Sequence, residues 1–329
     1  MKLVSLAAIG VHVRLLLAIP LFFVCETWVV PRMTEFIRNL VLSDVVPKNE
    51  LPALDAEVKC IHRRKDSWIA ETILLLAAVL LSFVAPRLPL LGATGAHDPS
   101  LVGAEMPLAG WWYWFVCLPL FRFLMLRWLW RLGLWCYFLR RLAKLDLHLV
   151  PTHPDGVAGL GYLEVVHTHF TPLVLAISVV LSAAFAEDIS TGAMQLASLY
   201  PYIALILLLD AVLFLSPLLF FTNKLWACRV KGLSDYMEFA AGYVDGFARK
   251  WIGQDPAHGN DPLGTPDLQS LADLNNSVNV VRNMRLVPGS RRLLASMAIA
   301  ALLPMLPLLL LKYPVTELIE KLFKTLSGL

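Results

Sequence analysis

The feature that most constrains this chain is a series of apolar runs, each about long enough to cross a bilayer. Apolar residues are gathered into continuous segments rather than spaced with the period of one helix face or one strand face. A helix that crosses a hydrocarbon core of roughly 30 Å needs about 20 mainly apolar residues. Of the 329 residues, 58% are hydrophobic and only 16% are charged, and the mean hydropathy is +0.66. The sequence therefore predicts an all-α, polytopic membrane protein.

Six segments meet this requirement, and we expect each of them to form a transmembrane helix. They cover residues 3–30, 68–86, 107–126, 162–186, 199–221 and 293–311. The first contains His12, Arg14 and Pro20, and no small-residue cleavage pattern follows it, so we interpret it as a retained helix rather than a signal peptide. The chain is then a single integral membrane domain over residues 1–329, with residues 222–292 forming a helical cytoplasmic subdomain.

The positions of Lys and Arg predict how the chain is threaded. The successive connections, residues 31–67, 87–106, 127–161, 187–198 and 222–292, hold 7, 1, 5, 0 and 9 of these residues. Positively charged connections stay on the cytoplasmic side of a membrane. This alternation places the three basic connections inside and both termini outside. The lysines at 312, 321 and 324 favour the alternative, an odd number of spans with the N-terminus inside.

The connection that follows the third predicted span keeps a helical pattern and is basic. Arg127 and Arg131 are four residues apart, Arg140 and Lys144 are also four apart, Arg141 follows, and tryptophans lie among them. At a membrane interface Trp rings lie in the headgroup layer, where Arg and Lys reach lipid phosphate. We expect lipid-headgroup contacts here, with an anion-binding site as the alternative. A net charge of only +3 and the lack of a nucleic-acid motif disfavour DNA or RNA as a partner.

Residues 222–292 are long enough for two or three helices around a loop rich in Gly, Pro, Asn and Asp. Residues 228–252 read as one helix, and a second begins at Pro266 and stops before Pro288. This second helix has an apolar face of Leu and Val and a polar face rich in amides. The polar face comprises Gln269, Asp273, Asn276 and Asn283. Such a face predicts a water-filled cavity or a hydrogen-bond network between subunits, and the whole region could bind a protein partner.

Three stretches of the chain carry a resemblance to a known family. They are "PTHPDGVAGLGYL" at 151–163, "LGTPDLQSLADLNNSVNVVRNMRLVP" at 263–288 and "LLPMLPLLLLKYP" at 302–314. They resemble a family of uncharacterised bacterial polytopic inner-membrane proteins, over roughly the C-terminal two-thirds of the chain. The resemblance implies a multi-pass protein of the bacterial inner membrane, and it implies no activity, ligand or catalytic residue.

The first of these stretches is unusually polar, and it has two interpretations. In "HPDG" the Asp155 carboxylate can cap backbone amides of a turn that begins at His153. Gly156, Gly159 and Gly161 allow tight backbone bends or close packing. This loop would then lie at the cytoplasmic mouth of the membrane domain as a structural turn.

The alternative interpretation of the same stretch is a metal site. His153, Asp155, Glu164 and His167 are ligand types that bind divalent metals, and the last two are three residues apart on one helix face. The sequence contains no HExxH signature, nucleophile elbow or phosphate-binding glycine loop. We therefore expect no cofactor, and a metalloenzyme is the least favoured class.

Charged residues within the predicted spans are the better indication of function. Asp210 is near the middle of the fifth span, Arg122 is in the third and Arg14 is in the first. An intramembrane charge is costly unless it is paired or faces water. One interpretation is that Asp210 pairs with an arginine and only fixes helix packing. The other is that the three residues line a polar path for an ion or a proton. We expect Pro217 to end its helix early, and helix breaks of this kind would help to open such a path.

These patterns lead to a hypothesis about function. We expect a membrane channel or transporter for an ion or a small solute, surrounded by membrane lipids and assembled as a homo-oligomer. The alternative is a membrane-anchored assembly or scaffolding protein that acts through residues 222–292.

Overall fold

The chain folds into helices throughout the part that the structure describes. This computed structural model describes residues 9–84, 111–190, 192, 194–252 and 266–311. The α-helices are α1 (Ile9–Val13), α2 (Ile19–Leu42), α3 (Leu51–Lys65), α4 (Trp68–Val84), α6 (Leu118–Leu142), α7 (Tyr162–Thr168), α8 (Thr171–Ser190), α9 (Leu199–Asp210), α10 (Thr222–Phe247), α11 (Pro266–Arg282) and α12 (Arg291–Leu302). The π-helical segments are η2 (Arg14–Ala18), η5 (Tyr113–Cys117), η7 (Ala211–Leu215) and η9 (Ala248–Ile252). The 3-10 segments are η6 (Leu196–Ser198), η8 (Ser216–Phe221) and η11 (Leu303–Leu311).

Many of these segments follow one another without a break and so form long helices. Four helices in the described residues are long and apolar enough to cross a membrane: Ile9–Leu42, Tyr162–Ser190, Leu199–Ile252 and Arg291–Leu308. A shorter apolar helix covers Trp68–Leu81, and the beginning of the predicted span 107–126 lies outside the described residues. The all-helical fold is therefore confirmed, and these four helices are compatible with a membrane protein, whereas the count of six spans and the cytoplasmic position of residues 222–292 stay predictions.

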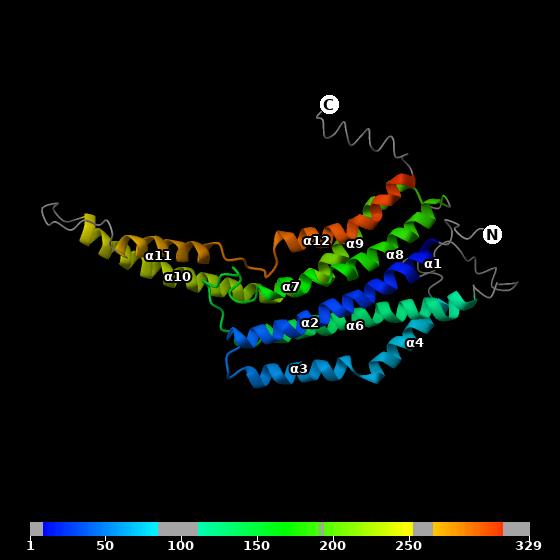
Figure 1. Cartoon of the computed structure of the whole chain (residues 1–329), viewed down its shortest axis with the longest axis horizontal. Helices are drawn as coiled ribbons and strands as arrows, with labels where there is room; N and C mark the ends of the chain where they lie inside the picture. Colours follow the sequence, from blue (N-terminus) through cyan, green and yellow to red (C-terminus); the bar gives the residue numbers. More distant parts are fainter. Residues whose placement is uncertain (1–8, 85–110, 191, 193, 253–265, 312–329) are drawn as a thin grey trace, which may run out of the picture.

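The membrane helices form one bundle with α6, α2 and α8 side by side (Figure 1). Helices α3 and α4 pack on α6 at one flank, and α12 packs on α8 at the other. Large aromatic side chains fill the interior where α2, α6, the α7–α8 junction and η7 meet. The fully buried ones are Phe22, Phe36, Phe138, Phe170 and Phe214. Their packing holds together helices that are far apart in the sequence.

The longest helix extends well beyond any bilayer. It runs for 54 residues, Leu199–Ile252, which at 1.5 Å per residue is about 80 Å. A hydrocarbon core is only roughly 30 Å thick. The second half therefore projects from one end of the bundle, and α11 folds back against α10 (Figure 1). We call α10, η9 and α11 the arm.

One local expectation was wrong. Pro217 does not end its helix, because it lies in the first turn of the 3-10 segment η8, where its missing N–H is tolerated, and the chain continues directly into α10. The second arm helix ends at Arg282, before Pro288 as expected. The residues between α11 and α12 leave the helix because their backbone and side chains bind another loop, which is described below.

Candidate functional site

Asp210 lies at the end of α9, directly before the π-helical segment η7. Its residue is only 7% exposed. Its Oδ2 atom is buried and has no hydrogen-bond partner among the described residues. Neither Arg14 nor Arg122 is within ion-pair distance of this carboxyl group, so the pairing that would have fixed helix packing does not form in the described structure.

Arg14 belongs to a second polar group at the junction of α1, η2, η5 and α8, and Arg122 of α6 lies close enough to Arg14 and Tyr113 to interact with both electrostatically. Arg14 donates from Nη1 to the hydroxyl oxygen of Tyr113 at 2.5 Å. The Gly10 backbone N–H donates to Oε1 of Glu187 at 2.8 Å, and Glu187 is 3% exposed. Arg122 is 1% exposed and Arg14 is 6% exposed. The sequence patterns had assigned Glu187 to an outside connection, although a carboxylate at the end of an apolar run was a signal of a buried polar site. They had not singled out Tyr113.

The π-helical segments within the membrane helices begin at these polar residues. Segment η2 begins at Arg14, η5 begins at Tyr113 and η7 begins directly after Asp210. A π-turn shifts the hydrogen-bond pattern and loosens the backbone locally, and such turns are frequent at functional sites. The π-helical segments and the buried polar side chains therefore lie at the same positions in the fold.

His167 connects α7 to the π-helical segment beside Asp210. The residue is fully buried. Its Nε2 accepts from the indole N–H of Trp135 at 3.3 Å, and its Nδ1 is 2.6 Å from the carbonyl oxygen of Phe214 in η7. An imidazole that accepts at Nε2 and donates at Nδ1 satisfies both contacts as one neutral tautomer. His167 is therefore a hydrogen-bonded interior group and not an open ligand.

The loop between α6 and α7 is organised around one carboxylate. Asp155 accepts backbone N–H donors from Val157 at 2.8 Å, Gly161 at 2.7 Å and Gly159 at 3.1 and 3.2 Å. Gly156 and Gly159 have φ values of 68° and 100°, which favour glycine. A β-carbon on Gly161 would be 2.7 Å from that of Asp155. The predicted Asp-capped turn with required glycines is therefore present.

The same loop is bound by the segment that joins α11 to α12. The Arg285 backbone N–H donates to the Gly156 carbonyl at 2.8 Å, and its Nη2 donates to the Asp155 carbonyl at 2.9 Å. Arg285 Nη1 is 3.0 Å from Oε2 of Glu164, whose other oxygen accepts from the Ser290 hydroxyl. We call these residues the latch. They bring together two of the stretches that carried the family resemblance.

The four candidate metal ligands do not converge. His153 and Asp155 are close, with Nδ1 and Oδ1 2.9 Å apart. Glu164, however, is engaged by Arg285, and His167 is enclosed in the core. Within the residues that the structure describes, no group of three His, Cys, Asp or Glu side chains is placed to hold a metal ion.

Most of the basic side chains on α6 have carboxylate partners. Arg131 Nη2 is 2.8 Å from Oε1 of Glu26, and Arg127 is 3.7 Å from the other oxygen of that carboxylate. Arg141 pairs with Glu57 of α3 at 2.5 Å. The exposed basic residues of this set are Arg140, Arg141 and Lys144. The helix is thus tied to α2 and α3, and its contacts with lipid headgroups stay a prediction.

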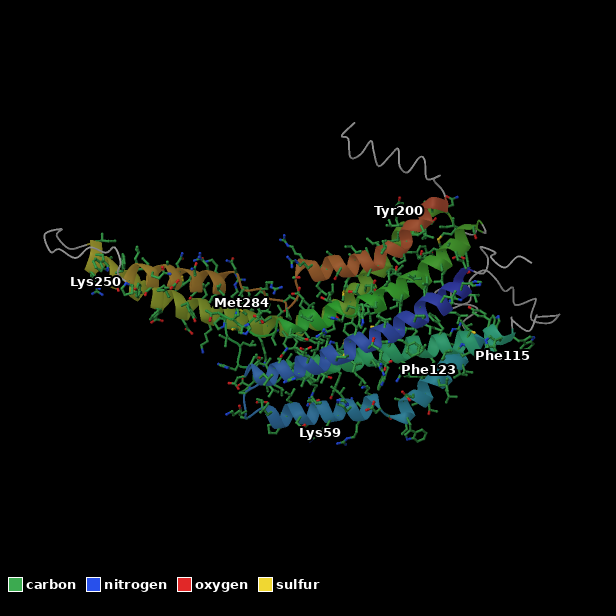
Figure 2. The ribbon with its side chains drawn as sticks, in the orientation of Figure 1. Lys59, Phe115, Phe123, Tyr200, Lys250 and Met284 are labelled. Carbon is green, nitrogen blue, oxygen red and sulfur yellow. The ribbon has the colours of Figure 1, made fainter. Side chains whose placement is uncertain are left out.

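The arm is held at its free end by one acidic side chain, near Lys250 in Figure 2. The Asp267 carboxylate accepts from Lys250 Nζ at 2.5 Å and from the Trp251 indole N–H at 3.0 Å. These hydrogen bonds hold the pKa of Asp267 below its usual value. The ion pair joins the first turn of α11 to η9.

The polar face of α11 does not line an enclosed space in this single chain. The amide of Gln269 donates to Asp273 at 3.1 Å along the helix. All four residues of the predicted face, Gln269, Asp273, Asn276 and Asn283, are exposed. The apolar face packs towards α10 through Val278 and Val281, which are buried. The face is therefore available to water or to another molecule.

Comparison with known proteins adds no relative. No family model matches the chain, and no curated protein or solved structure is similar to it. Its function must therefore be argued from the residues described above.

Proposed function

We propose that this protein is a membrane channel or transporter for an ion or a small solute, and that Asp210 is the intramembrane group that takes up a proton or a cation. The observation that carries the proposal is the burial of the Asp210 carboxyl group without an ion-pair partner among the described residues. The helix that holds it is among the most apolar stretches of the chain.

The energetic reason is the cost of a charge in hydrocarbon. An acidic side chain at the middle of a spanning helix costs about 3 kcal/mol or more when it stays charged and unpaired. A carboxyl group in this position is therefore neutralised, either by a proton or by a bound cation. Reversible neutralisation of this kind is what a membrane protein requires to carry a positive charge past an apolar barrier.

Two further features support a path rather than a closed bundle. Arg14, Arg122, Tyr113 and Glu187 place further polar groups within the same set of helices. The backbone around Asp210 deviates from regular α-helix over both η7 and η8. We propose that the loop containing Asp155 lies at the cytoplasmic mouth, and that copies of the chain assemble in a bacterial inner membrane.

The test is ion flux through purified protein in liposomes. Vesicles with an internal pH dye, or with dyes for Na⁺, K⁺ or Cl⁻, would receive wild-type protein, Asp210→Asn or Asp235→Asn. Asparagine has nearly the shape of aspartate, so the change removes the ionisable group without opening a cavity. Asp235 is an exposed aspartate on α10 and provides the matched control.

We expect wild-type protein and Asp235→Asn to raise the flux of one of these ions above that of empty vesicles, and Asp210→Asn to lower that flux at least tenfold. Asp210→Glu should retain part of it, because the ionisable group is kept. Absence of flux for all four ions, or equal flux in the two asparagine variants, would contradict the proposal.

A scaffolding role is a second candidate, and the arm favours it. Phe239, Val244 and Met237 on α10 are 65%, 48% and 47% exposed, although the arm projects beyond the bilayer. Apolar side chains gathered on a water-exposed helix are typical of a protein interface. Replacement of Phe239 and Met237 by Ser should then abolish recovery of a partner and leave ion flux unchanged, whereas the transport proposal expects the opposite pattern from Asp210→Asn.

A further inference from the structure

A cavity lies between α2, α3 and α6, away from Asp210 and the latch. It encloses about 110 Å³ open to the centre of a water molecule, which is several times the space that one water requires. Its walls are mainly apolar. Helix α2 contributes Val29, Met33 and Ile37, α3 contributes Val58 and Ile61, and α6 contributes Phe138. Walls of this kind suit a hydrocarbon chain better than a polar metabolite.

The cavity also has a cationic edge. Arg131 of α6 lines it together with Lys65 and His62 of α3. One guanidinium nitrogen of Arg131 is held by Glu26, but its Nη1 is buried and makes no hydrogen bond within the described residues. A buried N–H group without a partner is costly, and the natural partner for a guanidinium group is a carboxylate or a phosphate.

The charges around this edge favour an anion. The last turn of α3 carries Arg63 and Arg64 as well as Lys65. The facing carboxylates, Glu26 and Glu71, are already within ion-pair distance of α6 arginines. Lys65 lines the cavity and lies near Glu26, with Asp66 at 4.0 Å from it, whereas the Arg64 guanidinium lies over the ring of Tyr137.

The direction of the cavity distinguishes between kinds of amphiphile. Lys65 lies directly before the apolar helix α4, so the cationic edge is nearer the membrane. The apolar walls continue from there towards Ile37, Val58 and Phe138, away from α4. A bilayer phospholipid points its chains into the membrane and would fit this arrangement poorly. A single-chain molecule fits this arrangement when its charged end stays near the membrane surface and its chain points away from the membrane.

We propose that this cavity binds a single-chain anionic amphiphile of the fatty-acid class. Its carboxylate accepts hydrogen bonds from Arg131 Nη1 and from Lys65, and its chain occupies the apolar space between α2, α3 and α6. The site is separate from the proposed transport path, and the two proposals do not depend on each other.

The test is native mass spectrometry of the full chain in a neutral detergent, with palmitate as the probe. Ile61→Trp fills the cavity from α3. Ile73→Trp makes the same change on α4, where Ile73 is 59% exposed, and is the matched control. We expect one palmitate per chain in the wild type and in Ile73→Trp, and at least tenfold weaker binding in Ile61→Trp. Equal binding in the two variants would overturn the proposal.

The charged end is tested by comparing palmitate with hexadecanol, which has the same chain without the carboxylate. The wild type should prefer palmitate at least fivefold, and Arg131→Gln should remove that preference. Because this change leaves Glu26 without its partner, Lys65→Gln serves as a second, milder variant with a smaller loss. Preferential binding of phosphatidylglycerol over palmitate would assign the cavity to a bilayer lipid, and competition by inorganic phosphate alone would show that the chain contributes nothing. Either result would overturn the proposal.

Discussion

Replacement of Asp155 by Ala should destabilise the protein more than any other single change in the α6–α7 loop. The carboxylate accepts three backbone N–H groups, those of Val157, Gly159 and Gly161, at 2.7 to 3.2 Å. With alanine, these three N–H groups would have to bind water or the loop would have to rearrange. Arg285 would then lose the position of the residue 155 carbonyl oxygen to which it donates.

The size of the effect follows from the number of bonds. Hydrogen bonds to a charged group contribute about 1.5–3 kcal/mol each. The Asp155 side chain is 19% exposed, so water can replace part of what is lost, and the lower value is appropriate. Three bonds at that value give roughly 4–5 kcal/mol. For a large domain this corresponds to a fall of about 8–10 °C in the unfolding temperature.

Tryptophan fluorescence during heating of the detergent-solubilised protein would measure this difference, at one heating rate for all variants. Asp146→Ala is the control, because Asp146 is an exposed aspartate in the same connection. It should shift the unfolding temperature by about 1 °C or less. The reasoning would be refuted if Asp155→Ala and Asp146→Ala unfolded at the same temperature.

Two further predictions concern glycine geometry and pH. Gly159→Ala should lower the free energy of unfolding by about 1–3 kcal/mol, because φ is 100° and a β-carbon would be 2.6 Å from Val45 Cγ2. Gly133→Ala should instead stabilise α6 by about 0.5–1 kcal/mol, because nothing lies within 4 Å of an added β-carbon. The opposite signs are measurable by thermal unfolding, and equal shifts would contradict the geometric argument. The lowered pKa of Asp267 means that its bond to Lys250 is fully present above about pH 4 and is lost as the pH falls further. Hydrogen exchange at the start of α11 should therefore accelerate in acid in the wild type and be nearly independent of pH in Asp267→Asn, once intrinsic exchange is subtracted.

Much of the architecture was readable from the sequence because it depends on local patterns. Runs of about 20 apolar residues are determined by the thickness of a bilayer, and the four longest apolar helices of the described structure all fall on predicted spans. The helix over Pro266–Arg282 was predicted from its apolar spacing and from a helix-start signal that acts within one turn. The Asp155 turn was predicted for the same reason, since its donors lie within six residues of the acceptor.

Contacts between distant segments were decided only by the tertiary structure. Nothing near Arg285 in the sequence indicated that it would bind Asp155 and Glu164, which are 130 and 121 residues away. Likewise, Asp210 and Arg122 both lie in apolar helices, and their spacing in the chain gave no information on whether they pair. Whether opposite charges meet depends on the rotation and crossing of each helix, which are set by packing of side chains such as Phe214 and Phe170. The cavity lined by Arg131 likewise exists only because three helices from separate parts of the chain pack around it.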